Sequence, residues 1–237
     1  MQTIYHRADS RGHADHGWLN SHHSFSFAGY YHPERMNFGV LRVLNDDLVA
    51  GGGGFPTHPH QNMEIVSIPL QGNLAHRDNM GHEQVIRQGD VQIMSAGTGV
   101  SHSEYNHSAS DSVNFLQIWI LPQTQNIQPR YQQKTFDPVA RHNRFETVVS
   151  GDKADQSALW INQDARFLLG QLDAGQAQSH TLPAGKGLYI FVLDGTLQVG
   201  QQSLSKRDGY GVWNTSSIEI EATEGSEILL IEVPMAI

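Results

Sequence analysis

The sequence has 237 residues, 38% of them hydrophobic, and a formal net charge of −9 at pH 7. This length and composition allow one large or two small domains with an ample core, and they exclude a disordered chain. The negative charge argues against direct binding of nucleic acid, which needs clustered Lys and Arg. The lack of cysteine excludes disulfides and thiolate metal sites.

Two further features concern location and metal binding. No apolar run of about 18 residues occurs, and the N-terminus Met1-Gln-Thr-Ile-Tyr-His-Arg lacks a signal-peptide core. We therefore expect a cytoplasmic protein that does not insert into a membrane. The 14 histidines are many for this length, so only those with a paired spacing predict a metal site.

β-prone segments recur along the first half of the chain, separated by turn residues. We expect a half-buried strand at 23–27, a strand at 38–44 that ends at Asn45-Asp46-Asp47, and a short strand at 48–50. The four glycines at 51–54 favour a bend where backbones approach closely. Further strands are expected at 64–70, 91–94 and 114–121.

The region 122–155 is polar and contains three prolines, which is typical of an inter-domain connection. A short helix is weakly indicated at 141–149. A second series of short strands with glycine turns then follows, and this pattern predicts an all-β sandwich or barrel. The strands of this series are expected at 166–172, 187–193, 196–200, 218–222 and 227–233.

A faint internal repeat predicts two domains of one plan. The segment Pro69-Leu-Gln-Gly-Asn-Leu resembles Val192-Leu-Asp-Gly-Thr-Leu, 123 residues later. The same interval places His180 near the counterpart of the histidine pair described next, without a second imidazole beside it. We therefore expect domains at 1–140 and 155–237, the second without a metal site.

Two short segments put potential metal ligands two residues apart. One contains His58-Pro-His60 and the other His102-Ser-Glu104. Alternate side chains of an extended strand share one face, so the members of each pair point the same way. If both strands line one interior, three imidazoles and one carboxylate converge, and the sequence predicts a metal site.

The spacing leaves the carboxylate open between Glu104 and Glu64, because Glu64 has the same strand parity as His58 and His60. Such a ligand set leaves coordination positions free, which suits a transition metal better than a closed structural zinc site. We expect one divalent ion, iron first, with nickel, manganese, cobalt, copper and zinc as alternatives.

The remaining histidines and aromatic residues have simpler interpretations. No carboxylate pairs with His13, His16, His22 or His23 on a strand, so we expect structural roles for them. The simplest interpretation of Phe25, Phe27 and Trp119 is that they are core residues. Some of them could instead line a cavity beside the metal.

The two histidine segments resemble the cupin motifs G-x5-H-x-H-x3,4-E-x6-G and G-x5-P-x-G-x2-H-x3-N. The spacings before Gly72 and before His102 are longer than in the motifs, and Ser95 replaces the proline. Arg11-Gly-His-Ala-Asp-His-Gly-Trp and Phe25-Ser-Phe-Ala-Gly-Tyr-Tyr add a similarity to pirins. The matching motif residues are Gly52, His58, His60 and Glu64, then Gly89, Gly97, His102 and Asn106.

The resemblance to pirins implies a bicupin, with two jelly-roll-like β-barrels packed together and one metal in the first. It implies Glu104 as the fourth ligand, which leaves Glu64 as a second-shell candidate. For bacterial relatives it implies a quercetin 2,3-dioxygenase-like activity, with a small aromatic substrate and O2.

For eukaryotic relatives the resemblance implies a transcription-cofactor role. The alternative function is therefore a non-catalytic, metal-dependent regulatory protein, whose partner would be basic to suit the negative charge. Another cupin chemistry, such as isomerisation, is a third hypothesis. The sequence leaves these three hypotheses open.

Overall fold

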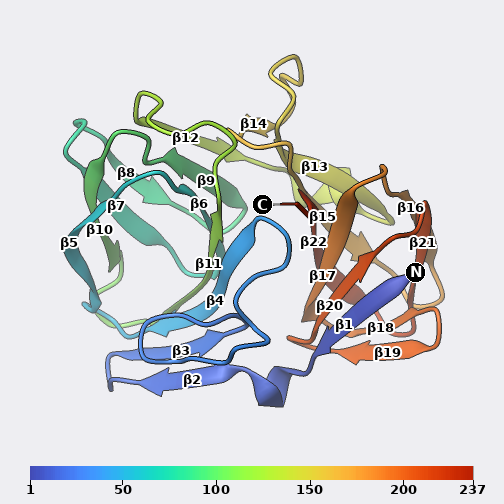
Figure 1. The fold of residues 1–237 in the computed structure, drawn as a ribbon. Coiled ribbons are helices and arrows are strands. Elements are labelled where there is room, and N and C mark those ends of the chain that lie inside the picture. Colours follow the sequence, from blue (N-terminus) through green and yellow to red (C-terminus); the bar gives the residue numbers. More distant parts are fainter. Residues whose placement is uncertain (237) are drawn as a thin grey trace.

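The computed structural model describes residues 1–236 as two β-sandwich lobes side by side, joined along their central sheets (Figure 1). Each lobe pairs a seven-stranded sheet with a four-stranded sheet. The predicted all-β bicupin is confirmed, with open jelly-roll-like sheets in place of closed barrels. Among the described residues there is no helix long and apolar enough to cross a membrane.

The first lobe takes its strands from the first 135 residues. Its large sheet has the order β12 (Arg130–Thr135), β9 (Asp90–Ser95), β6 (Glu64–Gln71), β11 (Val113–Ile120), β4 (Leu41–Val49), β3 (Leu19–His23) and β2 (Gly12–Asp15). Its small sheet has the order β5 (Gly54–His60), β10 (Val100–Asn106), β7 (Leu74–Asp78) and β8 (Glu83–Ile86).

The second lobe repeats this arrangement. Its large sheet has the order β1 (Gln2–His6), β20 (Gly209–Trp213), β17 (Lys186–Asp194), β22 (Ser226–Pro234), β15 (Arg166–Leu172), β13 (Arg144–Ser150) and β14 (Leu159–Trp160). Its small sheet has the order β16 (Ala177–Thr181), β21 (Ser217–Ala222), β18 (Thr196–Val199) and β19 (Gln202–Ser205). Two 3₁₀ turns, Ala8–Ser10 and Pro138–Arg141, complete the described secondary structure.

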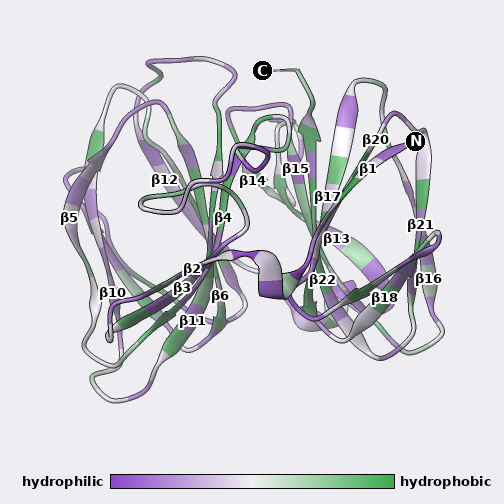
Figure 2. Ribbon diagram, turned by 60° about the horizontal axis from the view of Figure 1, so that its bottom comes forward, coloured by the Kyte–Doolittle hydropathy of each residue, from purple (hydrophilic) through white to green (hydrophobic). Residues whose placement is uncertain are grey.

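The two large sheets meet in the largest hydrophobic core, which alternation along the strands explains. In β11, Leu116, Ile118 and Ile120 belong to this shared core, together with Phe167 and Ile231 of the second lobe. The intervening residues of β11 face the interior of the first lobe. Hydrophobic residues accordingly concentrate where the lobes meet (Figure 2).

The structure corrects the expected break at residues 45–47. Strand β4 runs unbroken from Leu41 to Val49, with all three polar residues buried. Asp46 forms ion pairs with Arg11 and Arg207, both at 3.2 Å, and the Ser21 hydroxyl donates to Asp47. Three polar residues are tolerated inside a strand because these distant partners satisfy them.

Other expected boundaries also change. The half-buried strand expected at 23–27 is wrong, since β3 ends at His23 and a turn follows, with Ala28 at φ +49. The expected connection at 122–155 contains two strands, β12 and β13, and the helix expected at 141–149 is strand β13. The later strand series is confirmed by β15, β17, β18, β21 and β22.

The pairing of the first strand bears on the expected division of the chain into two domains. Strand β1 pairs with β20 in the second lobe, so the chain enters the second lobe before it builds the first. Strand β13, which lies entirely between the two expected ranges, also belongs to the second lobe. The division at 1–140 and 155–237 therefore remains a proposal, in which the N-terminal strand completes the opposite sheet.

A buried ion cluster occupies the second lobe where the first has its histidines. Glu232, 1% exposed, lies 2.7 Å from Arg166, 2.9 Å from His180 and 3.6 Å from Lys186. Burial raises the pKa of Glu232, but hydrogen bonds from His180 and Arg166 lower it more, to about 2. His180 thus has a carboxylate partner already, which supports the proposal that no metal binds in this lobe.

Replacing Glu232 by glutamine is expected to lower the free energy of unfolding by about 3 kcal/mol at pH 7, because the nearly buried Lys186 and the partly exposed Arg166 lose their counter-charge. Its pKa is depressed, so the stabilisation from its charge is complete above pH 4.5 and lost as the pH falls towards 2. Denaturant titrations should show the two proteins converging in acid. Glu227→Gln, exposed on the same strand, should match wild type; equal stability of the Glu232 variant at pH 7 would contradict this account.

Candidate metal centre

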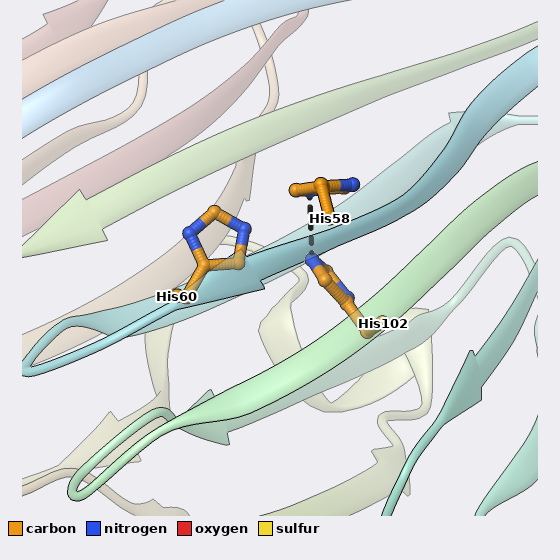
Figure 3. Close-up of side chains that lie close together, drawn as sticks. All are labelled: His58, His60 and His102. Atoms are coloured by element: carbon orange, nitrogen blue, oxygen red, sulfur yellow. Dashed lines mark hydrogen bonds between the residues drawn. The ribbon is translucent and has the colours of Figure 1, made fainter.

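The three predicted histidines meet at one end of the small sheet in the first lobe. His58 and His60 alternate along β5, so both project from one face, and His102 of β10 is the direct cross-strand partner of His58 (Figure 3). Antiparallel pairing of these two strands therefore brings together residues that are 42 or more positions apart in the sequence. The three potential ligand atoms lie within 4.8 Å of one another.

The hydrogen bonds of this cluster fit a cation. The Nδ1–H of His58 donates to the Pro56 carbonyl at 2.8 Å, which leaves the His58 Nε2 with a free lone pair. That atom lies 3.1 Å from the His102 Nε2. Two nitrogen atoms bound to one ion at about 2.0–2.1 Å are at most about 4.2 Å apart, so this spacing allows both to bind the same metal.

Two members of the cluster, the partly buried His60 and the buried His102, are neutral imidazoles near pH 7, the form that binds metals. Burial, with smaller contributions from the neighbouring imidazoles, lowers the pKa of His60 to about 4 and that of His102 to about 3. These two histidines therefore need no deprotonation to receive a cation at neutral pH.

Glu104 lies on β10 two residues after His102 and is 2% exposed. Ser67 donates to its Oε1 at 3.1 Å and the Gln117 amide donates to its Oε2 at 2.7 Å. Its carboxylate groups with His102 and a further histidine, His76, within 4.8 Å. Both oxygens are thus held by the opposite sheet, beside the histidine cluster.

Glu64 has other partners. The Ser95 hydroxyl donates to its carboxylate at 2.8 Å, and the Asn162 amide of the second lobe donates at 3.1 Å. The parity argument fails for Glu64 because the chain passes from the small sheet to the large sheet between residues 60 and 64, with Asn62 at φ +50. These contacts place Glu64 at the junction between the lobes, so the structure gives no support to the second-shell role.

His76 is the site residue that sequence reasoning missed. It is 1% exposed on β7, which pairs with β10 so that His76 lies opposite Glu104 and Asp78 opposite His102. The signal in the sequence is His76-Arg-Asp78, a histidine and a carboxylate at the same two-residue spacing as His102 and Glu104. Only the register between the strands shows that the two pairs meet.

Known proteins are similar to this chain in both sequence and fold. The pirin family model matches residues 5–120, and a model described as a quercetinase C-terminal cupin domain matches residues 147–233. The quercetin 2,3-dioxygenase of Escherichia coli K12 is 42% identical over 228 residues, covering 96% of this chain and 97% of that protein. The chain belongs to the pirin family.

Other pirins agree with this assignment. A pirin-like protein of Caulobacter vibrioides is 41% identical, over 94% of this chain and 96% of that protein. The crystal structure of YhhW from E. coli superposes with a TM-score of 0.95 at 41% identity, over 98% of each chain. A structure of bacterial pirin YhhW in complex with nickel(II) gives a TM-score of 0.93 at 39% identity, over 98% of this chain and 99% of that one.

A cavity of about 570 Å³ opens beside the histidine cluster of this pirin. His58, His60 and Glu104 line it, together with residues from β2, β3 and the turn that follows them. Phe27 and Trp119 form part of its aromatic wall in a T-shaped pair with ring centres 5.4 Å apart. Of the expected core aromatics, Phe25 alone is in the core between the lobes.

A polar row on the large sheet forms another wall of the cavity. Gln117, Asn45 and His23 are neighbours across three strands, and the His23 Nδ1 lies 2.9 Å from the Asn45 side-chain oxygen. Asp47 lies two residues after Asn45 on β4, and burial raises its pKa to about 7. Trp119 lies two residues after Gln117 on β11, so this face of the large sheet offers both hydrogen-bonding groups and an aromatic ring, which suits a planar hydroxylated molecule.

Proposed function

We propose that this pirin is a metal-dependent dioxygenase that acts on quercetin or a related flavonol, with O2 as co-substrate. The observation that carries the proposal is a cluster of three histidines that opens into a cavity lined by aromatic and polar residues. The name of the E. coli relative, quercetin 2,3-dioxygenase, supports the choice of substrate. We also propose a cytoplasmic location, which suits a chain without cysteine.

The proposed ligands are His58, His60, His102 and Glu104, holding one divalent transition metal. Iron is our first choice, and the nickel(II) complex of YhhW supports nickel as the alternative. A metal bound there with open positions would supply Lewis-acid or redox activation of the substrate and O2. Glu104 lies beside this position and lines the cavity, so it can accept the proton of a substrate hydroxyl.

The cavity walls would hold the substrate. The buried indole Nε1–H of Trp119 has no hydrogen-bond partner among residues 1–236, and a buried donor without a partner at a cavity is commonly satisfied by a bound molecule or water. Phe27 presents an aromatic surface next to it. Asn45 and Asp47, on the strand that pairs with that of Trp119, can hydrogen-bond the hydroxyl groups of a flavonol.

The metal-loaded protein is expected to consume O2 when quercetin is added, and the metal-free protein is expected not to. The experiment loads separate samples with iron, nickel, manganese and copper and follows O2 uptake together with the loss of quercetin absorbance. His58→Ala serves as a control that keeps the cavity but lacks a ligand. If every metal-loaded sample leaves quercetin intact under air, the dioxygenase proposal is wrong and the regulatory alternative takes its place.

A further inference from the structure

The imidazole of His102 has a partner on each side. Its Nε2 faces the proposed metal position, 3.1 Å from the Nε2 of His58. Its Nδ1 faces away from that position and lies 3.5 Å from the Nδ1 of His76. Both His76 and His102 are at most 2% exposed, so water does not compete for these contacts.

The far nitrogen of His76 contacts a carboxylate. Its Nε2 lies 3.2 Å from Oδ2 of Asp78, whose side chain has no exposed surface. The amides of Met80 and His82 donate to the other oxygen, Oδ1, at 2.9 and 3.0 Å. The His82 ring reaches Oδ2 at 2.8 Å, so Asp78 is fixed from several directions.

Asp78 is ionised in this setting. Burial raises the pKa of Asp78, but the hydrogen bonds from the His82 amide, the His76 and His82 rings and the Met80 amide lower it more. A carboxylate accepts hydrogen bonds and cannot donate them. The His76 Nε2 must therefore carry a proton, because a lone pair in its place would face the negative oxygen.

The proton positions of the whole chain follow from this one. A His76 ring with its single proton on Nε2 has an acceptor at Nδ1. The His102 Nδ1 facing it then carries the proton, which leaves the lone pair of the His102 Nε2 directed at the metal position. We infer that His76 and Asp78 are positioning residues that fix the metal-binding tautomer of His102.

His58 and His102 both have a hydrogen-bond partner at Nδ1, but they are held in different ways. His58 donates to a backbone carbonyl at 2.8 Å, whereas His102 donates to an imidazole that is backed by a buried carboxylate. The distance of 3.5 Å between His102 and His76 is long for a hydrogen bond. Its main consequence is therefore the choice of tautomer. Outer partners of this kind commonly change metal affinity 10–100-fold.

The test compares Ni²⁺ binding by wild type and Asp78→Asn, starting from metal-free protein. Asparagine can keep the turn by accepting from the Met80 and His82 amides, but its NH2 group then faces His76. That group donates, so His76 becomes an acceptor at Nε2 and a donor at Nδ1, and His102 is left with its proton on Nε2. We expect Ni²⁺ affinity to fall 10–100-fold.

The matched control is His82→Gln. His82 also contacts Asp78, but its side chain is 36% exposed and it does not lie between Asp78 and His102. We expect this variant to bind Ni²⁺ within about twofold of wild type. Nitrogen NMR of the histidine rings in metal-free protein supplies a readout that does not depend on metal. It is recorded in a His58→Ala background, because the His58 Nε2 lone pair, 3.1 Å away, would otherwise compete for a proton on the His102 Nε2. In that background His102 should carry its proton on Nδ1 when Asp78 is present and on Nε2 in Asp78→Asn.

The outcomes separate this inference from the ligand set on which it rests. Wild-type protein that binds no Ni²⁺ would overturn both. Wild-type binding together with equal affinity in Asp78→Asn, or a His102 proton on Nε2 in the His58→Ala background, would overturn the positioning role alone. His76→Phe removes the acceptor without offering a donor and should weaken binding less than Asp78→Asn. A reversed order would also count against the tautomer mechanism.

Discussion

Replacing His102 by alanine is expected to abolish tight metal binding, and replacing His58 should do the same. Each change removes one of three imidazole ligands whose nitrogens lie within 4.8 Å of one another. The loss should exceed the roughly 10–100-fold change that removal of an outer-shell partner causes. Isothermal titration with Ni²⁺ or Fe²⁺, followed by elemental analysis of the dialysed protein, measures both affinity and stoichiometry.

The control for this experiment is His107→Ala. His107 follows β10 directly and is exposed, and its backbone amide donates to the Asn73 carbonyl at 3.0 Å. It should bind one equivalent of metal as wild type does. Thermal unfolding of the metal-free proteins checks that the variants fold. Full metal occupancy in folded His102→Ala and His58→Ala would refute the proposed site.

The histidine cluster could be predicted from sequence because its information is local. His58 and His60 share a face on any straight strand, and so do His102 and the residue two positions later. That the two pairs meet depended on antiparallel pairing of β5 with β10, which the structure shows directly. Strand parity was sufficient for ligands within one strand, and the cupin-like glycines indicated that the strands belong together.

Other features depended on contacts between distant strands. His76 meets His102 because β7 pairs with β10 in one register, and register is not encoded in either strand alone. Glu64 shares the parity of His58 in sequence, but it lies on a different sheet. Strand parity therefore cannot be counted across a loop that connects two different sheets.

The buried carboxylates of β4 show the same limit for the fold. Asp46 and Asp47 are turn-forming residues in a local view, and the strand was expected to end there. Asp46 is satisfied by Arg11 and by Arg207 from the second lobe. Ion pairs across 35 and 161 residues of sequence therefore decide a secondary-structure boundary that local propensity gets wrong.

Replacing Glu104 by glutamine is expected to lower the rate of O2 consumption with quercetin by roughly 10²–10⁴-fold, the usual contribution of a general base. Metal affinity should fall much less, because the glutamine oxygen can still coordinate and accept from Gln117. Its NH2 group can donate to the Ser67 hydroxyl, which rotates to accept, so the hydrogen bonds that hold residue 104 persist.

Glu64→Gln is the matched control for this carboxylate. Its partners are Ser95 and Asn162 at the junction between the lobes, so we expect the variant to keep both metal and activity, at some cost in stability. Metal content and O2 uptake measured on the same samples separate binding from chemistry for both variants. Loss of metal in Glu64→Gln with retention in Glu104→Gln would reverse the assignment of the fourth ligand. An active Glu104→Gln with metal bound would exclude Glu104 as the base, since an amide cannot take up the substrate proton at neutral pH.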